Sequence, residues 1–229
     1  MINFGLVTEG KTDQIVIENI LVGYFQSDDL DVNELQPLRD ETDERRGQYF
    51  GGWHKVFEYC QSDKFKESFQ FNDYVIVQID TDESEKTHYD VSKRGKDGKP
   101  LSPEQLIEKI VEKFKEKIGE DFYHQKEKNI IFAISVETIE CWLLPLYYTD
   151  KRKSKTAGCT EAVNRELRKK GLNTLTNKNK EKNPESYRKV SKIYHKHKIL
   201  MNKYKENPSL KVFIEELRKR KIIVKEDDF

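Results

Sequence analysis

One short segment constrains the fold of this chain more than any other part of it. Residues 74–79 read Tyr-Val-Ile-Val-Gln-Ile, a nearly continuous run of apolar and β-branched residues that stops at Asp80. Runs of this composition are typical of strands in the middle of a parallel sheet, where both faces are covered. The segment therefore predicts a buried strand whose carboxyl end carries an acidic side chain.

The rest of the first 150 residues alternates between strand-like and helix-like segments. Further strands are predicted at residues 2–8 and 129–135, with a weaker one near 32–39 and a charged, glycine-containing loop at 40–52. Apolar spacing and capping residues predict helices at 11–24, around 53–60, after the cap Ser102 and from Glu137 onward. This alternation argues for an α/β fold with a mainly parallel sheet flanked by helices.

The pattern changes after residue 150. Basic amphipathic helices are predicted at residues 160–171, 184–198 and 208–221. Residues 151–229 carry 24 Lys and Arg against 10 Asp and Glu, whereas residues 1–90 carry 8 against 20. We therefore expect an acidic domain at 1–150 and a basic helical extension at 151–229, which either binds a polyanion or is only a solvated, lysine-rich surface.

Composition also argues against several classes of protein. No uninterrupted apolar stretch approaches the roughly 20 residues that a bilayer requires, so a membrane span is not expected. The chain begins with a strand-like run rather than a basic leader, which makes cytoplasmic residence the expectation. Cys60, Cys141 and Cys159 are widely spaced and lack a C-x-x-C pair, so we expect buried or idle thiols.

Carboxylates follow three of the predicted strands. They are Glu9 after the first, Asp80 and Asp82 after the central one, and Glu137 with Glu140 after a later one. Ligands of open parallel sheets gather beyond the carboxyl ends of the strands, so these side chains are expected to meet. Carboxylates that are forced together repel unless a cation compensates them, and oxygen ligands favour Mg²⁺ or Mn²⁺. A D-x-D by itself also occurs in many surface loops.

Two of these segments together resemble the Toprim domain, which is shared by topoisomerases, DnaG-type primases, 5S-rRNA maturation nucleases and OLD-family nucleases. Residues 7–13 read Val-Thr-Glu-Gly-Lys-Thr-Asp between a strand and a helix, and residues 75–82 read Val-Ile-Val-Gln-Ile-Asp-Thr-Asp. The resemblance implies that Glu9 is a metal ligand or general acid–base and that Asp80 and Asp82 are metal ligands.

Three further acids are candidate ligands by resemblance. The spacing of Glu9 and Asp13 is similar to the OLD-type variant, in which an acid one helical turn later joins a two-metal site. Residues 133–144, Ala-Ile-Ser-Val-Glu-Thr-Ile-Glu-Cys-Trp-Leu-Leu, resemble a motif of small defence-associated proteins of the RloB and AbiL types, which makes Glu137 and Glu140 candidates. Alternatively, Asp13 only interacts with its helix N-terminus, Glu137 caps a helix and Glu140 is exposed.

Basic side chains near these acids are candidates for contacts with a phosphate. Lys153 is the expected catalytic cation, as lysines are in OLD-type enzymes, and Lys11, Lys151, Arg152 and Lys155 are expected to bind nucleic acid; a generic charged loop at 151–155 is the alternative. Tyrosines of the C-terminal helices could stack on bases, although residues at such spacing more often lie in a core. These tyrosines are Tyr187, Tyr194 and Tyr204.

Together these features predict a metal-dependent nuclease that hydrolyses phosphodiester bonds in DNA or RNA, including tRNA. No Walker lysine motif or G-x-S-x-G motif is found. The resemblance implies that the chain is the effector of an anti-phage or abortive-infection system and works with a separate ATPase of the ABC/SMC-like type. A housekeeping RNA-maturation nuclease and a catalytically silent, partner-binding Toprim-like module are the alternatives, and a homo-oligomer is compatible with either.

Overall fold

A four-stranded, all-parallel sheet forms the centre of the computed structural model, which describes residues 2–38 and 51–224. The strands are β1 (Asn3–Val7), β2 (Asp31–Gln36), β3 (Tyr74–Asp80) and β4 (Ile130–Ser135), in the spatial order β2-β1-β3-β4. The predicted α/β class is therefore confirmed. Most of the predicted loop at 40–52 lies outside the described residues.

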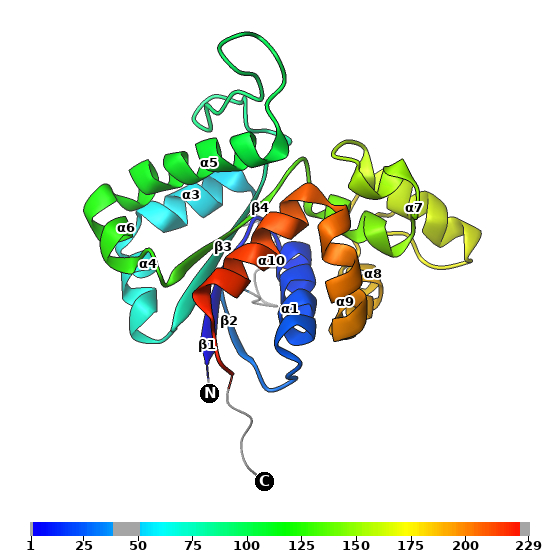
Figure 1. Cartoon of the computed structure of the whole chain (residues 1–229), viewed down its shortest axis with the longest axis horizontal. Helices are drawn as coiled ribbons and strands as arrows, with labels where there is room; N and C mark the ends of the chain where they lie inside the picture. Colours follow the sequence, from blue (N-terminus) through cyan, green and yellow to red (C-terminus); the bar gives the residue numbers. More distant parts are fainter. Residues whose placement is uncertain (1, 39–50, 225–229) are drawn as a thin grey trace.

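Helices cover both faces of this sheet (Figure 1). One face packs against α3 (Trp53–Gln61), α4 (Asp63–Glu67), α5 (Pro103–Ile118) and α6 (Glu120–Lys126). The other packs against α1 (Lys11–Phe25), α7 (Cys159–Lys169), α8 (Pro184–Ser191), α9 (His197–Lys203) and α10 (Pro208–Arg220). Five 3-10 helices complete the described chain: η1 (Ser68–Gln70), η2 (Ile139–Leu146), η3 (Lys151–Ser154), η4 (Lys192–His195) and η5 (Tyr204–Glu206).

Alternating side chains of the strands belong to two separate hydrophobic cores, one on each face of the sheet. In β3, Ile76 belongs to the core under α1, whereas Val75 and Val77 belong to the core under α3 and α5. These side chains, on both faces of β3, are fully buried, which explains why the strand is apolar almost without interruption. The α5 helix begins as its sequence predicts, because Ser102 and Gln105 form a reciprocal capping box ahead of it.

The basic C-terminal helices belong to the core of the sheet. Buried residues of α7, α8, α9 and α10 lie in the same hydrophobic core as α1, so a division at residue 150 does not separate two cores. Tyr187, Tyr194 and Tyr204 are at most 1% exposed, so these rings cannot stack on bases. Close packing at Gly23 explains part of this arrangement, because a Cβ there would lie 1.8 Å from the carbonyl oxygen of Tyr194.

Two predicted helices and one expectation about the cysteines differ from the structure. The helix expected from Glu137 onward is the 3-10 helix η2, which contains Pro145 and begins at Ile139. The helix expected at 184–198 is divided into α8, η4 and the start of α9. Cys141 and Cys159 form a disulfide that joins η2 to α7, so the expectation of idle thiols was wrong for this pair and holds only for the buried Cys60.

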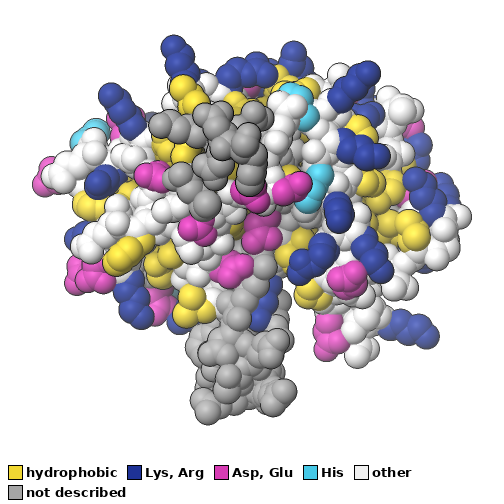
Figure 2. Space-filling model, turned by 90° about the horizontal axis from the view of Figure 1, so that it is seen from below, with side chains coloured by type: hydrophobic (Ala, Val, Ile, Leu, Met, Phe, Trp, Pro, Cys, Tyr) yellow, Lys and Arg dark blue, Asp and Glu magenta, His cyan; other side chains and the backbone are white. Residues whose placement is uncertain are grey.

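Charged side chains are spread over the surface near the two chain ends. In Figure 2, Lys and Arg side chains lie around the periphery of this face, and several Asp and Glu side chains lie near its centre. The visible cations therefore form no single patch here. No helix within residues 2–38 and 51–224 combines the length and the apolar character that crossing a bilayer would require.

Candidate functional site

The strand order defines one place where a ligand would be expected. Strand β1 lies between β2 and β3, and the chain leaves β1 towards β2 before it crosses back to β3. The connections that follow β1 and β3 therefore diverge at their carboxyl ends. Open parallel sheets bind ligands at such a switch point. In this chain, Glu9 follows β1 and Asp80 ends β3.

Direct hydrogen bonds join these two strand ends. The Asp80 amide donates to Glu9 Oε1 at 2.7 Å. The buried side chain of Gln78 bridges the same ends: its Oε1 accepts from the Glu9 amide at 3.1 Å, and its Nε2 donates to Asp80 Oδ1 at 2.8 Å. The two predicted carboxylates are therefore brought together and are held by backbone and amide groups.

The first turn of α1 adds a third carboxylate, Asp13. Its side chain is buried, and Oδ2 accepts from Thr12 Oγ1 at 3.2 Å. Oδ1 is buried and has no hydrogen-bond partner among residues 2–38 and 51–224. Leaving a buried charged oxygen without a partner is costly, so this atom points to a missing ligand.

Glu140 and Lys182 complete the cluster from the C-terminal half of the chain. The Lys182 ammonium lies 3.0 Å from Glu140 Oε1 and 3.9 Å from Asp13 Oδ2. The same Glu140 oxygen accepts a hydrogen bond from the Tyr187 hydroxyl. Glu140 is 1% exposed, so the alternative that it is a solvated surface acid was wrong.

The segment that follows β4 holds the turn that carries Asp82. The amides of Thr81 and Asp82 both donate to the Glu137 carbonyl, at 2.9 and 3.0 Å, and the Glu137 amide donates to Thr81 Oγ1 at 2.8 Å. Glu137 adopts a left-handed conformation with φ of 70°, which non-glycine residues adopt rarely and often at functional sites. Its backbone, rather than its carboxylate, therefore positions the D-x-D turn.

The electrostatics of the cluster follow from burial and from mutual repulsion. Burial and the neighbouring charges of Asp13 and Asp82 outweigh the Asp80 amide hydrogen bond and raise the pKa of Glu9 to about 8. Burial and the charges of Asp13 and Glu9 likewise raise the pKa of Asp80 well above its usual value. Such shifts mean that the site lacks enough positive charge to keep its carboxylates ionised.

Glu140 differs from the other acids of the cluster. Its burial opposes ionisation, but Lys182 and hydrogen bonds, one of them from Tyr187, lower its pKa to about 2. Burial also disfavours the Lys182 ammonium, yet Asp13 and Glu140 raise the pKa of this lysine well above its usual value. The ion pair of Glu140 and Lys182 therefore stays charged while Glu9 and Asp80 are biased towards protonation.

A cavity of about 570 Å³ opens beside these groups. Polar residues, charged residues and glycines line it, and they come from the ends of β1 and β3, the start of α1, the region of Gly52, η2, α7 and the segment that contains Lys182. The lining residues are Glu9, Gly10, Thr12, Asp13, Gly52, Asp80, Asp82, Glu83, Thr138, Glu140, Thr160, Glu161, Asn164, Thr176, Lys180 and Lys182. This volume lies within the range of pockets that bind small ligands or single units of a polymer.

Several predicted residues do not line this cavity. The Glu137 carboxylate lies 3.5 Å from the Lys93 ammonium, and Lys11 opens α1 without lining the cavity. In η3, Lys153 forms an ion pair with Glu206, and the Arg152 guanidinium binds Asp150. Lys151 and Lys155 are exposed, and neither lines the cavity. The structure thus brings together Glu9, Asp13, Asp80, Asp82 and Glu140, but not Glu137 or the 151–155 cluster.

Two lysines line the cavity, Lys180 and Lys182, and sequence reasoning missed both, including the one that pairs with Glu140, Lys182. Lys182 ends a short hairpin whose isolated bridge pairs it with Thr176, and Asn164 of α7 holds the hairpin through its bond to Thr176 Oγ1 at 3.0 Å. In the sequence this segment reads as a generic Asn- and Lys-rich linker, and no local signal distinguishes Lys182 from Lys178 or Lys180. Gln78 was missed as well, although a polar residue within a buried strand was a usable signal.

The donor set fits a hard divalent cation. Seven carboxylates line one cavity, and four of them, Glu9, Asp13, Asp80 and Asp82, lie on β1, α1 and β3 or next to them. One buried Asp13 oxygen has no partner among the described residues, and the raised pKa values of Glu9 and Asp80 reflect uncompensated negative charge. Even so, no three His, Cys, Asp or Glu side chains in the described ranges are already arranged as a metal-binding group. A bound ion would therefore require some of the carboxylates to turn towards it.

Comparisons with known proteins identify no relative. No family model matches the chain, and no significant match was found among curated proteins or solved structures. The resemblance to the Toprim domain therefore stays a prediction that rests on the residues around Glu9 and Asp80.

Proposed function

We propose that this protein is a divalent-metal-dependent phosphodiesterase that acts on nucleic acid, with its active site in the cavity beside β1 and β3. One observation carries the proposal: Glu9, Asp13, Asp80 and Asp82 converge at the switch point of a parallel sheet, and one buried Asp13 oxygen has no partner in the part of the chain that the structure describes. This is the arrangement expected of a site whose charge is balanced by an ion rather than by the protein.

The residues of the cavity divide into two groups by role. Glu9, Asp13, Asp80 and Asp82 would hold Mg²⁺ or Mn²⁺, and the ion would supply an activated water and neutralise charge that develops on the attacked phosphate. Gln78 holds the Asp80 carboxylate, and the Glu137 carbonyl holds the backbone of the turn that carries Asp82. These bonds keep both acids at the edge of the cavity, so that binding of the ion requires only side chains to turn.

In this proposal Lys182 is the catalytic cation, a role that the sequence predicted for Lys153. Its ammonium is already held in the cavity by Glu140, whose charge in turn is stabilised by Tyr187. A phosphate that enters the cavity would find this cation beside the carboxylates, where it would bind a non-bridging oxygen. Glu140 is therefore a residue that positions Lys182 rather than a metal ligand.

The decisive experiment is cleavage by the purified protein of plasmid DNA, single-stranded DNA and total tRNA. We expect hydrolysis of at least one substrate with Mg²⁺ or Mn²⁺ and none with a chelator. Glu9→Ala and Asp80→Ala should abolish it. The matched control is Glu161→Gln, which alters an exposed acid at the edge of the cavity that pairs with Arg168. Equal activity of wild type and both alanine variants would overturn the proposed site.

The biological setting extends the same proposal. The resemblance to small Toprim nucleases of defence loci favours an anti-phage effector that a separate ABC/SMC-like ATPase controls. Purified protein that cleaves only in the presence of an ATPase encoded beside it would support this setting. Metal-dependent cleavage of equal rate with and without that ATPase would contradict it while leaving the phosphodiesterase proposal intact.

A further inference from the structure

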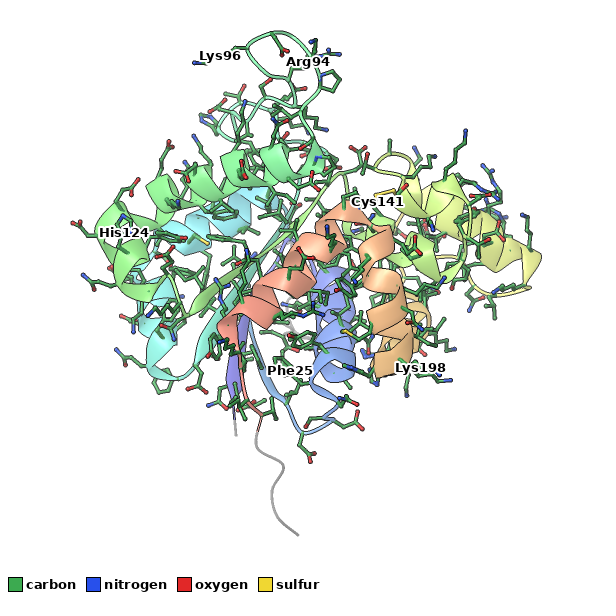
Figure 3. All side chains as sticks on the ribbon, viewed as in Figure 1. Phe25, Arg94, Lys96, His124, Cys141 and Lys198 are labelled. Atoms are coloured by element: carbon green, nitrogen blue, oxygen red, sulfur yellow. A yellow bond between two sulfur atoms is a disulfide. The ribbon has the colours of Figure 1, made fainter. Side chains whose placement is uncertain are left out.

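A basic hairpin projects from the molecule near the candidate site. We use this name for residues 93–101, which read Lys-Arg-Gly-Lys-Asp-Gly-Lys-Pro-Leu. An antiparallel bridge pairs Arg94 with Pro100, and the amides of Gly95 and Leu101 donate to the carbonyls of Lys99 and Lys93 at 2.8 and 2.9 Å. The segment is therefore an ordered hairpin. Figure 3 shows Arg94 and Lys96 at its tip, beyond α5 and away from the body of the protein.

The tip of the hairpin carries more positive than negative charge. Arg94, Lys96 and Lys99 are exposed, and Asp97 is the acid among them. The Arg94 guanidinium donates to the Gly98 carbonyl at 2.8 Å, which fixes the side chain without neutralising it. Lys99 lies 3.7 Å from Asp97, but 82% of the Lys99 side chain is exposed, and such pairs contribute little.

The root of the hairpin contacts the candidate site. The Lys93 ammonium donates to the Asp82 carbonyl at 2.9 Å and lies 3.5 Å from the Glu137 carboxylate. At the other side of the root, Leu101 packs against the hydrophobic core under α5. The hairpin is thus fixed to the same turn that presents Asp82 to the cavity, and its cations extend outward from that turn.

We propose that the basic hairpin binds the phosphate backbone of a nucleic-acid substrate at a distance from the bond that is cut. This inference rests on the proposed function, because it assigns a second contact to the substrate of the same cavity. The chemistry of the tip favours a polyanion over a protein. Three exposed cations flank two glycines and an acid, and the tip has none of the large apolar or aromatic side chains that anchor protein interfaces.

The test is the salt dependence of binding. Each phosphate contact contributes about 0.7 to the slope of log affinity against log salt concentration for single strands. The triple variant Arg94→Ser, Lys96→Ser, Lys99→Ser should therefore lower this slope by about 2 and weaken binding by roughly ten- to a hundredfold near 0.1 M salt. Fluorescence anisotropy with a labelled 20-nucleotide single strand in a chelator measures binding without cleavage.

Two control variants separate the hairpin from general charge effects. The variant Arg94→Lys, Lys96→Arg, Lys99→Arg keeps the charges and should keep the slope. Lys198→Ser removes an exposed lysine from the opposite end of the molecule, as Figure 3 shows, and should change binding less than Lys96→Ser does. A triple serine variant with the wild-type slope would overturn the proposal, as would equal effects of Lys198→Ser and Lys96→Ser.

A small substrate separates failure of the hairpin proposal from failure of the proposed phosphodiesterase activity. Bis(p-nitrophenyl) phosphate has a single phosphate, which cannot occupy the cavity and contact the hairpin as a second phosphate would. The triple serine variant should therefore hydrolyse it at the wild-type rate while its cleavage of long strands falls. A parallel loss on both substrates would overturn the hairpin proposal. If the wild type hydrolyses neither substrate with any metal, the proposed function fails, and the salt slope still decides whether the hairpin binds nucleic acid.

Discussion

Replacement of Glu9 by glutamine should stabilise the metal-free protein, and more strongly as the pH rises. The folded protein raises the pKa of Glu9 from 4.5 to about 8, mainly through burial. Between pH 4.5 and about pH 8, Glu9 keeps its proton in the folded state, whereas in the unfolded state it has released that proton. The stability that this proton contributes is fully present below the unfolded pKa and is lost as the pH rises through the folded pKa. Glutamine is neutral throughout, so the variant avoids this loss.

The size of the effect follows from the shift. One pKa unit corresponds to about 1.4 kcal/mol, so the difference in unfolding free energy between Glu9→Gln and wild type should grow by about 3 kcal/mol from pH 5 to pH 8. Glutamine keeps the oxygen that accepts the Asp80 amide, so the hydrogen bond between the ends of β1 and β3 is retained. The variant should be inactive, because it lacks a carboxylate ligand.

Urea denaturation at pH 5 and pH 8 in the presence of a chelator measures this difference. The exposed Glu161→Gln serves as the control and should change the unfolding free energy by less than about 0.5 kcal/mol at either pH. Saturating Mg²⁺ should stabilise wild type more at pH 8 than at pH 5, and Glu9→Gln less than wild type. A difference between Glu9→Gln and wild type that does not change with pH would refute the reasoning that the cluster lacks a compensating cation.

Three further predictions concern other parts of the structure. Lys182→Met should reduce metal-dependent cleavage at least about a hundredfold, and Lys182→Arg should retain more activity than Lys182→Met, as measured by kcat/KM on one oligonucleotide. Cys159→Ser should lower the unfolding free energy by about 3 kcal/mol, because the bond to Cys141 closes a loop of 18 residues, and a reductant should affect wild type but not the variant. Gly23→Ala should destabilise by about 3 kcal/mol in urea denaturation, because its Cβ would overlap backbone that cannot move freely; a change below about 1 kcal/mol would contradict this.

The sequence by itself determined the secondary structure of the central sheet and the acids at its edge. The run 74–79 predicts β3 because a strand that is buried on both faces is apolar at nearly every position, and Gln78 is the exception within this run. The capping residues at Ser102 predict the start of α5 for an equally local reason. Glu9, Asp80 and Asp82 could then be placed together, because the carboxyl ends of parallel strands share one edge of a sheet.

Only the tertiary structure decided which distant side chains meet that edge. Lys182 and Lys153 are alike in the sequence, but the hairpin at 176–182 carries Lys182 into the cavity, and Glu206 pairs with Lys153. Glu137 and Glu140 are three residues apart, yet one supports the D-x-D turn through its backbone and the other holds the lysine. Strand and helix patterns reflect local backbone preference and periodic burial, whereas these pairings depend on how helices pack across the sheet, which no local pattern encodes.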